Sequence, residues 1–256
     1  HGQHRRVALP PGDVLIHCGD IVGHYGKKSL PSLEKTFKDF VTYMEELHQY
    51  PLKIFIAGNH DIVLDRKKYE YKGSTSMLRQ LSKGVVYLEN QGIDYKGLKI
   101  WGSPVSLSRM ELQGSKFYSD AFERTNKHRK SLWESIPEGL DVLITHAPPC
   151  GTLDETDFFN PEPSPLGDPL LASRLAALRR PPRVHVFGHC HRDTGVRMRN
   201  HTLCINASMV AAIRNSPDDM GCAYVFDLPI PNNGGSQNTH AKKRNNEITR
   251  GEKNEE

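Results

Sequence analysis

Five short segments of this chain carry residues of the kinds that bind metal ions, and four of them directly follow a run of β-forming apolar residues. The segments are His1, Gly19-Asp20, Gly58-Asn59-His60-Asp61, Thr145-His146 and Gly188-His189-Cys190-His191. Scattered surface histidines would not keep such a register with the predicted strands. The pattern therefore indicates one site, built where parallel strands of a sheet open onto loops.

The donor atoms in these segments suit a pair of divalent cations. A carboxylate such as Asp20 can bridge two cations, Asn59 offers an amide oxygen, and His146, His189 and His191 offer imidazole nitrogens. This mixture of oxygen and nitrogen donors, without a thiolate pattern, is typical of sites for Mn, Fe or Zn. In an extended segment His189 and His191 project to the same side, so each can reach one of two neighbouring metals.

Two metals about 3.5–4 Å apart can clamp the attacking and leaving oxygens of a phosphoryl displacement, with a bridging hydroxide as the nucleophile. We expect His60 to protonate the leaving oxygen as a general acid, with Asp61 orienting its ring. Asn59 and His60 are also expected to contact the substrate. His24 can meet the phosphate, and Asn206 ends a predicted strand near the expected cleft, so these two are further candidate contacts. His185 lies within a strand run and is expected to be a core residue or to support a ligand.

The remaining pattern predicts an α/β domain in which strands and helices alternate early and strands dominate late. We expect strands at 13–18, 53–57, 85–88, 141–145, 184–187, 195–199, 202–206 and 222–227, and a hairpin over 93–101. Apolar residues at helical spacing predict helices at 31–49, 75–83, 120–135 and 170–179. Asp168-Pro169 is a suitable cap and first turn for the last of these helices. Loops are expected at 103–119 and at 150–168, and the second is long enough to suggest an active-site role.

Composition limits the class of protein. The 256 residues fit one domain over 1–229, followed by a polar tail over 230–256 that is expected to be disordered. The five cysteines include no Cys-x-x-Cys pair, which favours reduced thiols in a cytoplasmic protein. No apolar run reaches the ~20 residues that span a bilayer. A net charge of +4 without a long basic block argues against general nucleic-acid binding.

In order and spacing, the five segments resemble the calcineurin-like metallophosphoesterase superfamily, whose motifs are Asp-x-His, Gly-Asp, Gly-Asn-His-Asp/Glu, a later His, and Gly-His-x-His. The resemblance covers residues 1–228. Within the superfamily, the chain is most similar to the branch of metallophosphoesterase-domain-containing proteins. The segments that carry this narrower similarity are 10–20, 143–149, 185–189 and 205–208. The resemblance implies a four-layer αββα sandwich of two mixed β-sheets flanked by helices. It also implies two bound divalent metal ions.

Three features of the motifs refine what the resemblance implies. The first motif has an Asp two residues before its His, so we expect a first strand and one further ligand upstream of His1. Protein serine/threonine phosphatases continue the second motif with Asp-Arg-Gly, whereas this chain continues from Gly19-Asp20 with Ile-Val-Gly-His. Phosphoprotein substrates are therefore disfavoured and a small phosphodiester is preferred. Some vertebrate members replace the first His of the last motif by Gly, which weakens catalysis, but this chain keeps His189.

The leading hypothesis is a cytoplasmic, dinuclear metal-dependent phosphodiesterase that acts on small, cyclic-nucleotide-like esters. The partners implied are a small phosphate-ester substrate, such as a nucleotide, but no membrane and no nucleic acid in general. Two alternatives stay open. One is a weakly active or inactive nucleotide-binding or scaffold protein of the same fold, and the other is a phosphomonoesterase. The sequence leaves the oligomeric state open.

Overall fold

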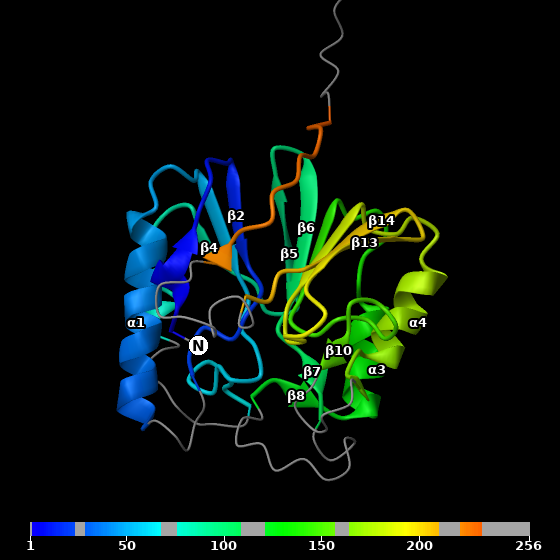
Figure 1. Cartoon of the computed structure of the whole chain (residues 1–256), viewed down its shortest axis with the longest axis horizontal. Helices are drawn as coiled ribbons and strands as arrows, with labels where there is room; N and C mark the ends of the chain where they lie inside the picture. Colours follow the sequence, from blue (N-terminus) through cyan, green and yellow to red (C-terminus); the bar gives the residue numbers. More distant parts are fainter. Residues whose placement is uncertain are drawn as a thin grey trace, which may run out of the picture.

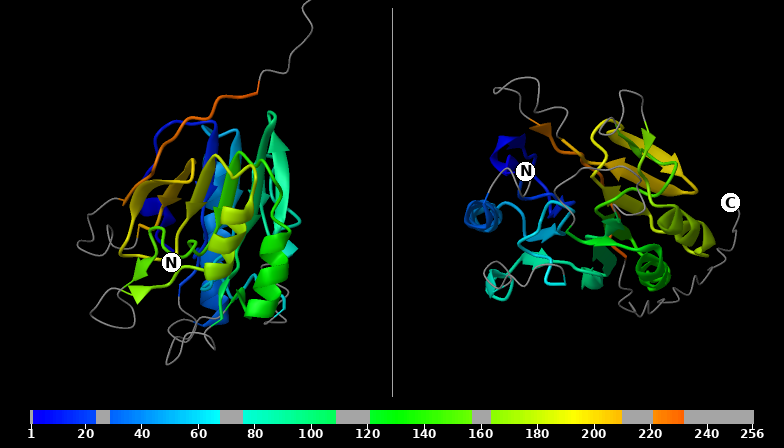
Figure 2. Two further views of the ribbon diagram at one scale, coloured as in Figure 1. Left: turned by 90° about the vertical axis from the view of Figure 1, so that its right-hand side faces the viewer. Right: turned by 90° about the horizontal axis from the view of Figure 1, so that it is seen from below.

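Two β-sheets packed face to face form the centre of the molecule, and helices cover their outer faces (Figures 1 and 2). The computed structural model describes residues 2–23, 29–67, 76–108, 121–156, 164–209 and 221–231. This layered arrangement confirms the predicted α/β sandwich.

The smaller sheet has the order β2-β3-β4, and its three strands are parallel. They are β2 (Val14–His17), β3 (Leu52–Phe55) and β4 (Val85–Tyr87). The carboxyl ends of all three strands therefore lie at one edge of the sheet.

The larger sheet has the order β13-β14-β12-β9-β6-β5 and is mixed. Its strands are β5 (Gln91–Tyr95), β6 (Leu98–Ser103), β9 (Val142–Thr145), β12 (Val184–Phe187), β13 (Gly195–Arg199) and β14 (Thr202–Asn206). The central strands β6, β9, β12 and β14 are parallel, whereas β5 and β13 join the two margins as antiparallel hairpin partners. The parallel centre of this sheet again gathers strand ends at one edge.

Alternation along the strands divides the core into layers. In β3, Ile54 packs between the two sheets with Ile100 and Ile144, while Phe55 faces outward. Both faces of β3 are buried, which explains its continuous apolar pattern.

Helix α1 (Leu30–Glu46) covers the outer face of the smaller sheet. Its apolar stripe is buried against Phe55 and Val85; the residues of the stripe are Leu33, Phe37, Phe40, Val41 and Met44. This helix was predicted over 31–49, and it ends earlier because the backbone turns out of the helical conformation at Leu47.

Helices α3 (Asn126–Glu134) and α4 (Pro169–Ala177) cover the outer face of the larger sheet. Trp133 and Leu171 pack there with Leu143 of β9. The predicted cap of α4 is confirmed, because the Asp168 carboxylate accepts hydrogen bonds from the first backbone N–H groups of the helix.

Short elements complete the described chain. They are the 3₁₀ turn η1 (His4–Arg6), the parallel pair β1 (Val7–Ala8) and β15 (Gly221–Cys222), the parallel pair β7 (Ser106–Leu107) and β8 (Glu123–Arg124), and the antiparallel pair β10 (Glu155–Thr156) and β11 (Ser164–Pro165).

The prediction of a helix over 120–135 is wrong at its beginning. The helix starts only at Asn126, and residues 123–124 form β8 instead. Asp65 holds this stretch extended, because its carboxylate accepts the backbone N–H of Phe122 and pairs with the guanidinium of Arg124. A carboxylate 57 residues away in sequence thus overrides the local helical pattern.

Two other predicted elements are also shorter than expected. Over the described part of 75–83, only Ser76 and Met77 are helical, and the chain then turns through bonds between residues three apart. The predicted strand 222–227 is reduced to Gly221–Cys222, because its partner β1 is itself only two residues long. Apart from residues 230 and 231, the predicted tail lies outside the described residues.

All five cysteines are free thiols, as their spacing predicts. In the part of the chain that the structure describes, no helix is both long and apolar enough to cross a bilayer.

Candidate metal centre

The predicted ligands lie at the carboxyl ends of four strands drawn from both sheets. Asp20 follows β2, Asn59 follows β3, His146 follows β9, and His189 and His191 follow β12. The ends of β9 and β12 are joined directly, since the backbone N–H of residue 188 donates to the carbonyl of His146 at 3.0 Å. The two sheets meet at the same place, because the His146 ring after β9 lies 2.9 Å from the carbonyl oxygen of Cys18 after β2.

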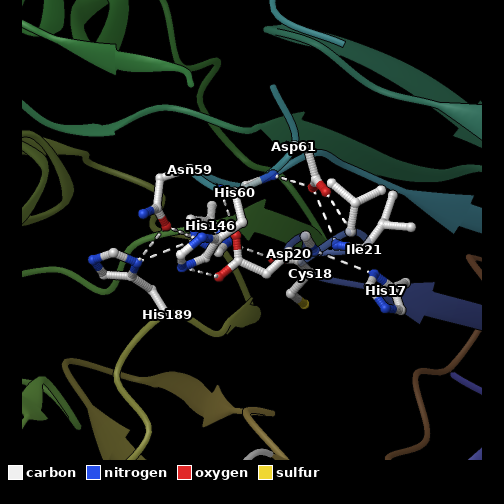
Figure 3. Close-up of polar contacts among 12 residues, drawn as sticks. His17, Cys18, Asp20, Ile21, Asn59, His60, Asp61, His146 and His189 are labelled. Atoms are coloured by element: carbon white, nitrogen blue, oxygen red, sulfur yellow. Dashed lines mark hydrogen bonds and ion pairs between the residues drawn. The ribbon is translucent and has the colours of Figure 1, made fainter. Parts of the chain in front are cut away.

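Three side chains converge on a single point (Figure 3). Asn59 Oδ1 lies 2.9 Å from His146 Nε2 and 3.0 Å from His189 Nδ1, and these two nitrogens are 3.2 Å apart. Asp20 Oδ1 lies 3.4 Å from His146 Nε2. One donor atom each from Asp20, His146 and His189 falls within 4.8 Å of the others.

The protonation of His146 follows from its other contact. Its Nδ1 lies 2.9 Å from the carbonyl oxygen of Cys18, which can only accept, so Nδ1 carries the proton. Nε2, which carries the lone pair in the neutral ring, lies toward the oxygen of Asn59 and the nitrogen of His189. A histidine that donates one N–H to a carbonyl while its other nitrogen faces outward is the usual arrangement of a metal ligand.

Lone pairs this close repel one another unless a proton or a cation lies between them. Burial, followed by the nearby His146, lowers the pKa of His189 to about 3, so its ring is neutral and able to bind a metal. Burial acts to raise the pKa of Asp20, but the surrounding imidazoles, His146 first, hold it below its usual value. Two imidazole nitrogens, an amide oxygen and a carboxylate fit a divalent ion of the Mn, Fe or Zn type.

The backbone at the ligands is unusual. Asp20 and His189 have φ angles of 59° and 67°, in the left-handed region that side-chain-bearing residues rarely adopt. Gly19 has φ of 95°, and a Cβ there would lie 2.7 Å from His146 Nδ1. Non-glycine residues with such backbones often mark functional sites, where the surrounding structure enforces them.

His60 is buried next to Asp20. Its Nε2 lies 3.9 Å from Asp20 Oδ2, and its backbone N–H donates to Asp20 Oδ1 at 3.0 Å. The ring therefore lies beside the ligand cluster.

The expectation that Asp61 orients His60 is wrong. The Asp61 carboxylate accepts backbone N–H groups instead: Gly58 at 2.7 Å, Val22 at 2.8 Å and Ile21 at 3.2 Å. Figure 3 shows it turned toward Ile21. Asp61 thereby ties together the two loops that carry Asp20 and Asn59. Burial raises its pKa to about 6.

Asn206 is a second correction, because its side chain is buried and its NH₂ group already bonds to the protein. The side chain is fully buried, and its Nδ2 lies within 3.1 Å of three backbone carbonyls, those of Leu153, Cys190 and Asp193. Its Oδ1 accepts the N–H of Ser208. Asn206 fixes the loop around His191 from behind.

A cavity of about 340 Å³ opens beside the cluster. Asp20, His146, His189 and His191 all contribute to its wall. His191 therefore borders the same space as the converging ligands. His1, a predicted metal ligand, and His24, a predicted substrate contact, lie outside the described residues.

Sequence reasoning missed the carbonyl of Cys18. This residue looks like a small packing side chain, and its side chain is indeed buried. Its contribution is a backbone oxygen, which no side-chain pattern reveals.

Comparison with known proteins agrees with this geometry. The model of the calcineurin-like phosphoesterase family matches residues 4–193. The human metallophosphoesterase domain-containing protein 1 is 32% identical over 250 residues, covering 91% of this chain and 70% of its own. A UPF0046 protein of Caenorhabditis elegans is 31% identical over 220 residues, covering 81% of this chain and 66% of its own. A solved crystal structure that is 17% identical superposes with a TM-score of 0.52 over 77% of this chain and 79% of its own, which shows the fold alone.

Proposed function

The chain belongs to the calcineurin-like phosphoesterase family and is a metal-dependent phosphoesterase; we propose that it hydrolyses small, cyclic-nucleotide-like phosphodiesters with two divalent metal ions. The convergence of Asn59 Oδ1, His146 Nε2 and His189 Nδ1 within 3.2 Å of one another carries this proposal. All three are atoms of kinds that bind metal ions, and they lie beside the carboxylate of Asp20. That arrangement is suited to cations.

Bound at these ligands, two divalent ions would polarise the phosphoryl oxygens and lower the pKa of a water molecule. The chain itself supplies the remaining chemistry. The buried ring of His60 beside Asp20 supports a role for His60 as the general acid that protonates the departing oxygen. Asp61 and the carbonyl of Cys18 hold the loops and the His146 ring in place.

A small substrate is supported by the site and by the second motif. The cavity of about 340 Å³ lies in the range of pockets for small molecules, and Leu15, Phe40 and Met44 give it apolar walls. Such walls suit the organic group of an ester. Protein phosphatases carry an Asp-Arg pair in the segment that follows their Gly-Asp motif. This chain lacks that pair after Gly19-Asp20. We extend the proposal to manganese as the metal, because the ligands are oxygen and nitrogen, and to a cytoplasmic location, because the cysteines are free.

The test is Mn²⁺-dependent hydrolysis of bis(p-nitrophenyl) phosphate, followed by metal analysis of the same samples. Asn59→Ala and His189→Ala should lose both turnover and metal, whereas His48→Ala, at an exposed histidine of the chain, should lose neither. Purified Asn59→Ala with unchanged turnover would overturn the proposal. Faster hydrolysis of p-nitrophenyl phosphate than of the diester would identify a phosphomonoesterase. Nucleotide binding without turnover, with metal present, would identify a binding protein.

The general acid has its own test. His60→Gln should keep both metals and lose roughly 10²–10⁴-fold in turnover, the usual contribution of general acid catalysis. The loss should be smaller for a nitrophenol leaving group, which needs less protonation. Loss of metal, with a rate deficit that is equal across leaving groups, would make His60 a structural residue instead.

A further inference from the structure

A hydrogen-bonded pair lies directly behind the ligand His146. The side chain of His185, on β12, is fully buried, and its Nε2 is 2.8 Å from Thr145 Oγ1. The same hydroxyl lies 2.7 Å from the carbonyl oxygen of Ala147. Thr145 and Ala147 are the residues on either side of His146, so the pair encloses the ligand's own backbone.

The direction of these hydrogen bonds follows from counting protons. The Thr145 hydroxyl has one proton, and the Ala147 carbonyl can only accept, so the hydroxyl donates to Ala147. The hydroxyl oxygen must then accept a hydrogen bond from the Nε2–H of His185. His185 Nδ1 carries the lone pair and has no hydrogen-bond partner among the described residues. Burial lowers the pKa of His185 to about 3, which agrees with a neutral ring.

We propose that His185 and Thr145 are positioning residues that fix the ligand His146 in the geometry the metal requires. The inference rests on the proposed metal site. Backbone bonds already hold His146 itself, since its N–H donates to Ser103 and its carbonyl accepts from Gly188. The two hydrogen bonds from His185 to Thr145 and from Thr145 to Ala147, called here the His185 relay, add a further constraint. They close the chain into a tight turn immediately after the ligand and tie that turn to β12, the strand that leads to His189.

The His146 ring is then held from two directions. On one side its Nδ1–H donates to the carbonyl of Cys18, the residue that directly follows β2. On the other, the His185 relay holds the main chain from which the ring projects. Removing the Thr145 hydroxyl would leave the buried carbonyl of Ala147 and the buried Nε2–H of His185 without partners, and the turn would shift to reach new ones. Partners that orient a metal ligand in this way typically contribute 10–100-fold to metal affinity.

The experiment titrates metal-free protein with Mn²⁺ by calorimetry and with Co²⁺ by its d–d absorption, alongside thermal melting without metal. Thr145→Val keeps the shape of the side chain and removes the hydroxyl, and it should weaken affinity about 10–100-fold and alter the Co²⁺ spectrum. Thr145→Ser keeps the hydroxyl and should bind within about 2-fold of the wild type. Thr202→Val is the matched control, because Thr202 is also buried and donates its hydroxyl to a backbone carbonyl, that of Pro182, away from the ligands. It should lose thermal stability but keep metal affinity.

A second pair of variants keeps the test decisive where Thr145→Val fails to fold. The side-chain amide of His185→Gln can still donate to the hydroxyl, so this variant should bind metal nearly as the wild type does, whereas His185→Leu should not. Equal metal affinities in Thr145→Val, Thr202→Val and the wild type, or in the two His185 variants, would overturn the proposal. Wild-type protein that binds metal but hydrolyses no ester would refute the proposed function alone. Wild-type protein that binds no metal would refute both.

Discussion

Replacing Asp61 tests whether this carboxylate stabilises the loops of the site or serves catalysis. Asp61 is fully buried, and its two oxygens accept three backbone N–H groups, from Ile21, Val22 and Gly58. If Asp61 orients the general acid, its replacement should lower the turnover of the enzyme and leave the stability of the fold unchanged. If Asp61 joins the two loops, its replacement should first lower the stability of the fold.

The magnitude can be worked out from the contacts. Each buried donor left without a partner costs about 1–3 kcal/mol. Asp61→Ala leaves three such donors, and because they share one carboxylate the losses overlap, to about 3–6 kcal/mol in total. In Asp61→Asn one oxygen can still serve Ile21 and Gly58, while the new NH₂ group faces the N–H of Val22, so the loss is about 1–3 kcal/mol. For a domain of this size each kcal/mol lowers Tm by about 2–4 °C.

The assay is thermal and denaturant unfolding of the metal-free protein. Asp13→Asn provides the matched control, because the Asp13 side chain is 76% exposed, and its stability should change by less than about 0.5 kcal/mol. We expect Asp61→Ala to be less stable than Asp61→Asn, and both to be less stable than the control. An Asp61→Asn protein that melts with the wild type but turns over as slowly as His60→Gln would refute this reasoning and restore the orienting role.

Three further predictions address the site, the core and the thiols. A Cβ at Gly58 would lie 2.5 Å from His146 Cε1, so Gly58→Ala should weaken Mn²⁺ affinity more than about 10-fold by calorimetry, and unchanged affinity would contradict the described approach. Asp168 accepts both Arg129 Nε and Trp133 Nε1 at 2.8 Å, so Asp168→Ala should cost about 3–5 kcal/mol in urea unfolding, and a loss below about 1 kcal/mol would count against it. Burial raises the pKa of Cys18 to about 12, so its thiolate forms only at far higher pH than usual. At pH 8, Ellman's reagent should label the exposed Cys222 and spare Cys18 until the protein unfolds; equal labelling of the native protein would be the contrary result.

The strands and the ligands at their ends could be predicted because both depend on local sequence. A short apolar run such as 142–145 forms a buried strand wherever both faces of the sheet are covered, and His146 follows it directly. Parallel strands place their carboxyl ends together, so the site follows once the strands are known. The cap of α4 was predictable for the same reason, since Asp168 bonds to residues two and three positions away.

The roles of Asp61 and Asn206 could not be predicted in this way. Each satisfies backbone groups from segments far away in sequence: Asp61 bonds to residues 39 and 40 positions away, and Asn206 bonds to Leu153, 53 positions away. Which N–H or C=O groups lack partners depends on how the loops pack, and the sequence pattern does not contain that information. Next to the histidine expected to serve as the acid, Asp61 looked like an orienting carboxylate. The N–H groups of Ile21, Val22 and Gly58, from two buried loops, compete more strongly for the same oxygens.

Several destabilising features of this protein lie at the ligand cluster. The left-handed backbones at Asp20 and His189 each cost about 1–3 kcal/mol, and the ligand atoms are buried close together. A protein tolerates such local costs only where the surrounding structure holds the residues in place. Here the packed strands beneath the ligands, the Asp61 carboxylate and the carbonyl of Cys18 do so. Because the ligands are brought together only in the folded chain, a bound cation should stabilise the fold as well as equip it for catalysis. The same residues should therefore control both stability and activity.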